Sequence, residues 1–189
     1  MVFVGLLKRI NGRRACLPLI HRFYLSKKAI ASKSDNMNIP DIATSFHTKQ
    51  QQAAEMIIHL AYHFVGVPVT VICDSWFGND GLFKPLRKHL GDSLHLLSRL
   101  RSNIVLYSMA PKPTKGKRGR SRKHGNRLGT CAEVAARTKT KASSHRVFLY
   151  GHYREVMVAT KLVMLKTLKC PVRVVWVFRH NGLPSFLLT

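Results

Sequence analysis

The chain has 189 residues, of which 32 are Lys or Arg and only 8 are Asp or Glu, so its formal net charge is +24 at pH 7. A hydrophobic content of 46% excludes global disorder, and the length is enough for a sizeable core. The charge predicts a polyanionic partner, and nucleic acid comes first because Lys and Arg contacts to phosphate dominate its affinity. A membrane surface comes second, but no amphipathic Lys/Arg helix supports it, and no apolar run reaches the length of a spanning helix.

The cysteines and the N-terminus indicate the cellular compartment. The four cysteines (Cys16, Cys73, Cys131 and Cys170) lie far apart and form no CxxC motif, which is typical of reduced thiols in the core and not of a zinc ribbon or a disulfide framework. At the N-terminus the apolar residues precede the basic ones, the reverse of a signal peptide. We therefore expect a cytoplasmic protein.

The first half of the chain predicts alternating strands and helices. Residues 2–25 predict a hairpin around Asn11-Gly12, with Pro18 placing its second strand at a sheet edge. Residues 26–47 are polar and predict a loop. Apolar spacing predicts a helix over 49–65, and Thr48 with Gln51 predicts a capping box at its start.

The next segment predicts a buried strand and a short helix. Residues 67–73 are apolar on both alternations, which predicts a strand buried on both faces. A helix is expected over 82–90, with Pro85 in its first turn. Two further strands are expected at 94–100 and 104–107.

A basic segment separates this half from a β-rich region. Residues 111–130 have almost no apolar side chains and predict a mobile loop. Its basic residues predict DNA contact, either by Arg118 and Arg120 in a minor groove or by non-specific phosphate attraction. From residue 146 onward β-branched residues predict strands, with Asn181-Gly182 as a hairpin turn. The loop residues proposed to bind DNA are Lys115, Lys117, Arg118, Arg120, Arg122 and Lys123.

Asp74 is the strongest candidate for chemistry. It ends the apolar strand at 67–73, and ligands gather beyond the carboxyl ends of strands in sheets with parallel strands. A carboxylate there suits Mg²⁺ or Mn²⁺, but an Asp at a turn also caps backbone N–H groups. Position alone leaves ligand and cap equally favoured.

Other residues offer weaker alternatives. Arg99 and Arg101 would position phosphate near Asp74, and strand alternation would point both the same way. Trp76 and Phe77 favour packing of the turn over stacking on a base. The remaining polar candidates are expected to be structural or solvated: Asp35, Asp41, His59, His63, Glu133 and Glu155.

The stretches "VPVTVICDSWFGNDGLFKPL" (67–86) and "LHLLSRLRSNIVLYSMAPKPTKGKRGRSRKHG" (94–125) resemble the DDE transposases of bacterial insertion sequences, the cut-and-paste group. The resemblance implies a ribonuclease-H-like core, Mg²⁺ or Mn²⁺ as cofactor, and DNA at transposon ends as substrate. It makes Asp74 the second of three metal-binding carboxylates that support DNA cleavage and strand transfer. The resemblance also implies a bacterial protein of the cytoplasm that associates with the nucleoid. A homodimer is one option for the intact parent protein.

The sequence departs from that family at both ends. The first Asp belongs on a strand before the hairpin, and the Glu belongs on a later helix with a Tyr-Arg-Glu-Lys signature. We therefore expect a partial transposase without catalysis, which folds poorly unless the hairpin pairs with the strand before Asp74. The alternative is a non-enzymatic basic nucleic-acid-binding protein.

The predicted fold class is α/β (α+β): an incomplete ribonuclease-H-like mixed sheet with helices, followed by a β-rich insertion. The expected organisation is a partial core over 1–110, a basic loop over 111–130 and a truncated β-rich region over 131–189.

Overall fold

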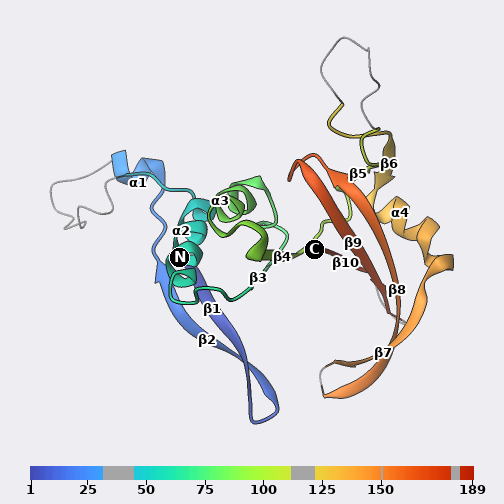
Figure 1. Ribbon diagram of the computed structural model, residues 1–189, viewed down its shortest axis with the longest axis horizontal. Coiled ribbons are helices and arrows are strands. Elements are labelled where there is room, and N and C mark those ends of the chain that lie inside the picture. The colour runs from blue at the N-terminus through green and yellow to red at the C-terminus, as the bar shows by residue number, and fades with distance from the viewer. Residues whose placement is uncertain (32–44, 112–121, 150, 180–183) are drawn as a thin grey trace. The chain divides into compact units, whose positions relative to one another are not determined.

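The computed structural model describes residues 1–31, 45–111, 122–149, 151–179 and 184–189 (Figure 1). The chain forms two compact units. The first comprises Met1–Val69 and Gly81–Ser93, and the second comprises Thr70–Asp80 and Leu94–Thr189. Each unit is described separately below.

The first unit begins with the predicted hairpin. Strands β1 (Val2–Ile10) and β2 (Arg13–Arg22) pair antiparallel around a two-residue turn. Asn11 and Gly12 have φ values of 47° and 78°, as a type I′ turn requires, so the hairpin is confirmed. The register shifts between Val4 and Gly5, where Gly5 lies opposite Pro18. Because Pro18 has no N–H to donate, this irregularity falls where the ladder would otherwise lose a bond.

Three helices complete the first unit, and they partly correct the sequence-based expectations. Residues 27–31 form helix α1 (Lys27–Ala31) where a loop was predicted, and residues 32–44 lie outside the described part. Helix α2 (Lys49–Ala61) has the predicted capping box of Thr48 and Gln51, but it ends four residues earlier than expected. It packs against both strands of the hairpin.

Helix α3 (Asp80–Leu90) starts two residues before the predicted boundary and is followed by a 3₁₀ turn, Gly91–Ser93. Pro85 therefore lies in the second turn of the helix, and its expected place in the first turn was wrong. Its carbonyl still accepts a bond, since His89 Nδ1 lies 2.8 Å from Pro85 O.

The second unit is built on an eight-stranded mixed sheet with the order β3-β4-β10-β9-β8-β5-β6, to which β7 is added along β8. Its strands are β3 (Val69–Cys73), β4 (Leu94–Arg99), β5 (Val105–Tyr107), β6 (Arg127–Thr130), β7 (Ser143–Leu149), β8 (His152–Leu165), β9 (Cys170–Phe178) and β10 (Ser185–Leu188). The sheet thus combines strands from both sides of the basic segment. The predicted turn at Asn181-Gly182 lies outside the described residues, but β9 and β10 pair antiparallel.

A helix and a buried tryptophan form the core of the second unit. Helix α4 (Cys131–Thr138) follows β6 directly, and a 3₁₀ turn (Lys139–Lys141) comes after it. Trp176 on β9 is fully buried, and its Nε1 donates to the carbonyl of Cys131 at 3.2 Å. This bond ties the start of α4 to the middle of the sheet.

Three expectations for the second unit were wrong. Residues 127–130 form a strand, not the end of a loop, and the region after 130 begins with a helix. Strand β3 is not buried on both faces, because Ile72 is 55% exposed and Thr70 is exposed as well. Thr70 and Ile72 alternate along the strand and so share one face, and that face is left uncovered, which the apolar pattern does not encode.

The mixed α/β class is confirmed, and it is consistent with a ribonuclease-H-like domain. Within the described residues, β1 pairs with β2 and not with β3, so the direct pairing that could have replaced a central strand is not formed. No helix in the described part of the chain is long and apolar enough to cross a bilayer.

Candidate functional site

Asp74 comes directly after β3 and organises the turn that follows. Its Oδ1 accepts from the N–H groups of Trp76 at 2.9 Å and Phe77 at 3.2 Å. The cap that the sequence offered as one alternative is therefore formed. Its other carboxylate oxygen, Oδ2, has no hydrogen-bond partner among the described residues, and the side chain is exposed. The same carboxylate can thus cap the turn with one oxygen and offer the other to a cation.

The main chain at Asp74 is held from the neighbouring strand. Ser98 on β4 is 1% exposed, and its Oγ donates to the carbonyl of Asp74 at 2.8 Å. The same carbonyl accepts from Gly78 N at 3.3 Å. A Cβ on Gly78 would lie 2.8 Å from Ser98 Cβ and closer still to its Oγ, so only glycine fits there. The glycine of the aromatic-Gly turn is therefore required for close approach to Ser98, and the sequence alone could not identify that partner.

The aromatic pair packs on itself within this turn. The rings of Trp76 and Phe77 meet edge to face with centroids 5.0 Å apart, and the amide of Asn79 donates to Trp76 O at 2.7 Å. Trp76 remains 43% exposed. The packing interpretation explains both rings, while the exposed part of Trp76 lies two residues from the carboxylate.

Most other acidic residues have local structural partners. Glu55 pairs with Arg22 and His47, Asp92 pairs with Arg87, and Asp80 receives Lys169 Nζ at 2.9 Å. Glu133 is exposed, as expected, and it also forms a capping box with Thr130 at the start of α4. Glu155 lies on β8 in register with Arg146, as its predicted strand requires. Asp35 and Asp41 lie outside the described residues.

The described residues do not fit a complete two-metal site. Two metal ions are held by several carboxylates together, and no group of three His, Cys, Asp or Glu side chains comes together in the part of the chain that is described. His59 and His63 contact each other edge to face, with ring centroids 5.5 Å apart, and both are exposed. Asp74 by itself can supply one ligand.

Only some of the basic residues expected to bind DNA lie in the described part of the chain. Arg99 ends β4 and Arg101 follows beyond it, and both are exposed. Because Arg101 is outside the strand, alternation does not set its direction, so that argument fails. Arg122 and Lys123 are exposed. The other basic-loop candidates lie outside the described residues: Lys115, Lys117, Arg118 and Arg120.

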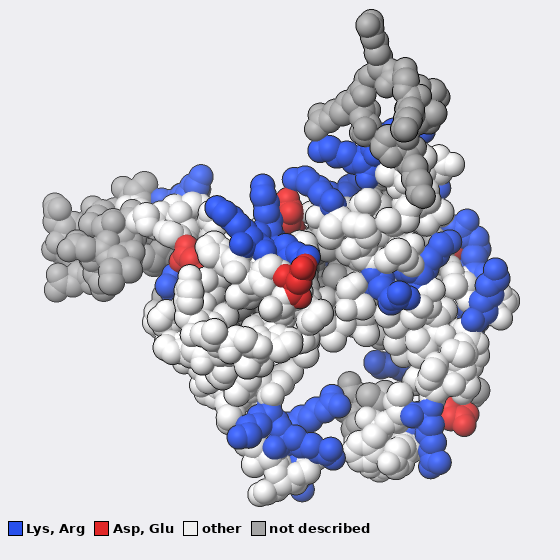
Figure 2. All heavy atoms as spheres, viewed as in Figure 1, with Lys and Arg blue, Asp and Glu red and all other residues white. Residues whose placement is uncertain are grey.

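The residues that flank the basic segment are held by hydrogen bonds and ring contacts, which the sequence analysis did not predict. Ser108 and Asn126 bond through their main chains at 2.9 Å, and Ser108 Oγ accepts from Asn126 N at 2.9 Å. The rings of Tyr107 and His124 lie 4.4 Å apart, and Lys166 Nζ lies 4.3 Å from the Tyr107 ring. The segment between Ser108 and Asn126 therefore leaves a closed β5–β6 hairpin end. Figure 2 shows far more Lys and Arg than Asp and Glu on the visible face.

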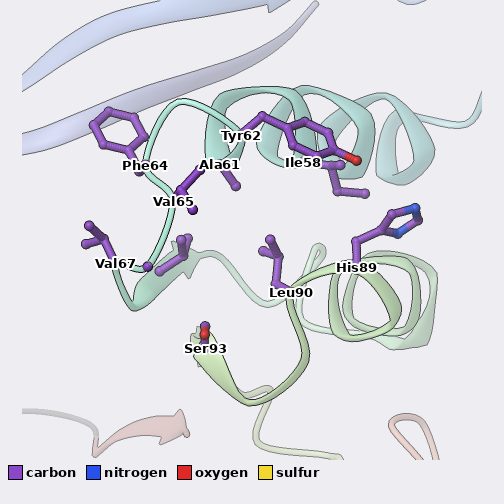
Figure 3. Close-up of a pocket in the computed structure, with 11 residues that line it drawn as sticks. Ile58, Ala61, Tyr62, Phe64, Val65, Val67, His89, Leu90 and Ser93 are labelled. Carbon is purple, nitrogen blue, oxygen red and sulfur yellow. The ribbon is translucent and has the colours of Figure 1, made fainter.

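A separate pocket of about 210 Å³ lies in the first unit, between the end of α2 and the end of α3 (Figure 3). Its lining is mainly apolar and contains no acidic side chain. The lining residues are Ile58, Ala61, Tyr62, Phe64, Val65, Gly66, Val67, Val69, His89, Leu90 and Ser93. Its composition suits neither a metal ion nor a phosphate, and it does not include Asp74.

Two thiols in the second unit have altered acidity. Burial raises the pKa of Cys73, the hydrogen bond with Ser98 lowers it, and the negative charge of Asp74 raises it. Burial also raises the pKa of Cys131 to about 11, with a hydrogen bond to Trp176 acting in the opposite direction. All four cysteines are free, but the expected core position is wrong for Cys16, which is exposed, whereas Cys131 is buried.

Comparison with known protein families gives a match over most of the chain. A family model described as DDE superfamily endonuclease matches residues 1–155. No curated protein and no solved structure matches the chain.

Replacing Gly78 tests the turn. Gly78→Ala should lower the free energy of unfolding by about 1–3 kcal/mol, because the new Cβ overlaps with buried Ser98. Urea unfolding of Gly78→Ala, Ser98→Gly and the double variant measures the coupling. Ser98→Gly makes room for the Cβ, so Gly78→Ala should cost much less in that background. Simply additive losses would contradict the contact.

The acidity of Cys73 tests the charge of Asp74. Asp74→Asn keeps an oxygen for the turn but removes the negative charge, so the pKa of Cys73 should fall and its alkylation curve should shift to lower pH. The shift should be small, because burial is the larger cause. Peptide mapping after alkylation at a series of pH values measures it, with Cys131 as the internal control. An unchanged curve would show that Asp74 does not act on this thiol.

Proposed function

The chain belongs to the DDE superfamily endonuclease family, and from this premise we propose that it is a DNA-binding transposase chain in which Asp74 is a metal-binding carboxylate. The family implies a DNA substrate and the use of divalent metal. The observation that supports the role of Asp74 is its geometry. One oxygen accepts two N–H bonds from the turn, and the exposed residue directly follows the end of a strand.

The geometry gives Asp74 the properties of a preorganised ligand. Two N–H bonds on Oδ1 and the Ser98 bond to the Asp74 carbonyl restrict the carboxylate and its main chain. A restricted ligand loses little conformational entropy on binding. Carboxylate oxygens are hard ligands of the kind that Mg²⁺ and Mn²⁺ prefer.

The finer proposal is a partial transposase of a bacterial insertion sequence, of the cut-and-paste group, that does not cut DNA by itself. Its residue-level basis is that the described part of the chain brings together no group of three His, Cys, Asp or Glu side chains. Two more carboxylates would have to come from elsewhere to hold two metal ions, which in this family support cleavage and joining of transposon ends. We place the protein at the bacterial nucleoid, with a homodimer as an option for the parent protein.

DNA binding is the part of the proposal that the charge supports most directly. We propose that the basic segment from Lys115 to Lys123, with Arg99 and Arg101, contacts DNA phosphates. Arg99, Arg101, Arg122 and Lys123 are exposed, and none of them forms an ion pair with an acidic side chain among the described residues.

A second candidate is a non-enzymatic nucleic-acid-binding protein. It is favoured by the turn itself, because the bonds to Oδ1 give Asp74 a structural role that needs no metal. The two candidate functions differ at Oδ2 of Asp74, because only the transposase function uses this oxygen as a metal ligand.

The role of Asp74 is tested by comparing Asp74→Asn with Asp74→Ala. Mn²⁺ should broaden the indole N–H resonance of Trp76, two residues from Asp74, more than that of buried Trp176. Both variants should lose this effect, whereas only Asp74→Ala, which lacks the cap, should lose about 0.5–2 kcal/mol of stability. Equal broadening in all three proteins would identify Asp74 as a cap alone. Nicking of supercoiled DNA with Mn²⁺ by the unaltered chain, abolished in Asp74→Ala, would overturn the inactivity and establish an enzyme.

The basic segment is tested by neutralisation. Changing Lys115, Lys117, Arg118, Arg120, Arg122 and Lys123 to Gln should weaken binding to duplex DNA and flatten its salt dependence by about 0.9 in log–log slope for each lost phosphate contact. The control removes the same charge from exposed residues of the second unit: Lys139, Lys141, Arg154, Lys161, Arg173 and Arg179. Equal losses of DNA affinity in both variants would show that the segment contributes only its general positive charge. Unchanged affinity in the first variant would exclude its contact with DNA.

A further inference from the structure

The tip of the β1–β2 hairpin concentrates positive charge that the functions above leave unused. Lys8, Arg9, Arg13 and Arg14 flank the Asn11-Gly12 turn, and all four are exposed. The first acidic residue in the chain is Asp35, so neither strand carries a compensating carboxylate. Figure 1 locates the end of the hairpin, and Figure 2, in the same view, shows Lys and Arg side chains gathered there.

The register distributes the four cations over both faces of the ribbon. Arg9 lies opposite Arg14, and because cross-strand partners point to the same side, these two share one face. Lys8 and Arg13 occupy the neighbouring positions of their strands and therefore point to the other face. Each face of the tip thus presents two cations.

The tip is also fixed in shape. The turn residues have the positive φ values of a type I′ turn, and Arg9 Nε donates to Gly12 O at 3.2 Å. Little backbone freedom would be lost when such a tip binds a ligand. A flat anionic surface, such as a membrane, would meet only one face and leave two of the cations unused.

We propose that this hairpin tip enters the major groove of duplex DNA and contacts the phosphates of both strands, one pair of cations on each side. The major groove admits a two-stranded β-ribbon, and the backbones on its two walls provide anions to both faces at once. The inference rests on the proposed DNA-binding function, but it assigns a second contact element, in the first unit, apart from the basic segment and Asp74.

The test compares two variants of equal charge. In one, Lys8, Arg9, Arg13 and Arg14 are changed to Gln. In the control, the changes are in exposed residues of the second unit: Lys139, Lys141, Lys161 and Arg173. At about 0.1 M salt the hairpin variant should bind duplex DNA at least about tenfold more weakly, with a log–log salt slope lower by about 2–4. The control should change both quantities much less.

Face-specific variants sharpen the test. Arg9→Gln with Arg14→Gln removes one face, and Lys8→Gln with Arg13→Gln removes the other. If phosphates lie on both sides, each pair should lower the slope by about 1–2. An effect confined to one pair would overturn the two-sided contact. Circular dichroism and urea unfolding of each variant exclude loss of the fold as the cause.

A natural thiol gives a second, independent readout. Cys16 is exposed on β2 and lies opposite Leu7, two positions along from the Arg9–Arg14 pair. Duplex DNA with a disulfide-activated thiol tethered in the major groove should trap Cys16 as a mixed disulfide, and the hairpin variant and Cys16→Ser should not be trapped. Absence of trapping together with unchanged affinity in the hairpin variant would overturn this inference alone. If the unaltered chain bound no DNA at all, the proposed function would fail with it.

Discussion

The turn after β3 depends on how Ser98 holds the carbonyl of Asp74. That bond joins two neighbouring strands at the point where β3 ends, and the lack of a side chain at Gly78 allows the approach. Once the main chain is fixed there, the carboxylate is within reach of the N–H groups of Trp76 and Phe77 and bonds to both through Oδ1. The direction of Oδ2 follows from these contacts. A carboxylate on a free loop would have to be ordered before it could hold an ion, whereas this one is already positioned.

The chain has few acidic residues, so the contacts of each can be compared with those of Asp74. In the described part of the chain, Glu55, Asp80, Asp92 and Glu133 are engaged by basic side chains or by helix caps. Each of these contacts explains why a carboxylate stands where it does. Asp74 is explained only in part, because its cap uses one oxygen. The excess of Lys and Arg is not neutralised within the chain, so it repels itself until a polyanion is bound. Family membership and charge therefore lead to the same partner by independent arguments.

Local patterns predicted what local interactions determine. Asn11-Gly12 required its turn and Thr48 with Gln51 began its helix, since both signals lie within a few residues. Helix α4 could have been found in the same way, because Thr130 and Glu133 have the spacing of a capping box, but the basic composition before them suggested a loop. The exposure of Ile72 could not be predicted, because it depends on whether other elements cover its face of the sheet. The contact of Gly78 with Ser98 joins residues 20 positions apart, and no periodicity encodes it. For Asp74 the sequence offered cap or ligand as alternatives, and the geometry allows both at once.

The place of β3 at the end of the strand order links the sheet to the chemistry. Its outer edge has no partner strand among the described residues, and Asp74 follows its last residue. An unpaired edge is a template for another strand, which would recover main-chain hydrogen bonds along β3. A strand added in the parallel direction would end beside Asp74, because the carboxyl ends of parallel neighbours meet at one edge of a sheet. The exposed carboxylate of Asp74 therefore follows the end of a sheet edge that another strand could extend.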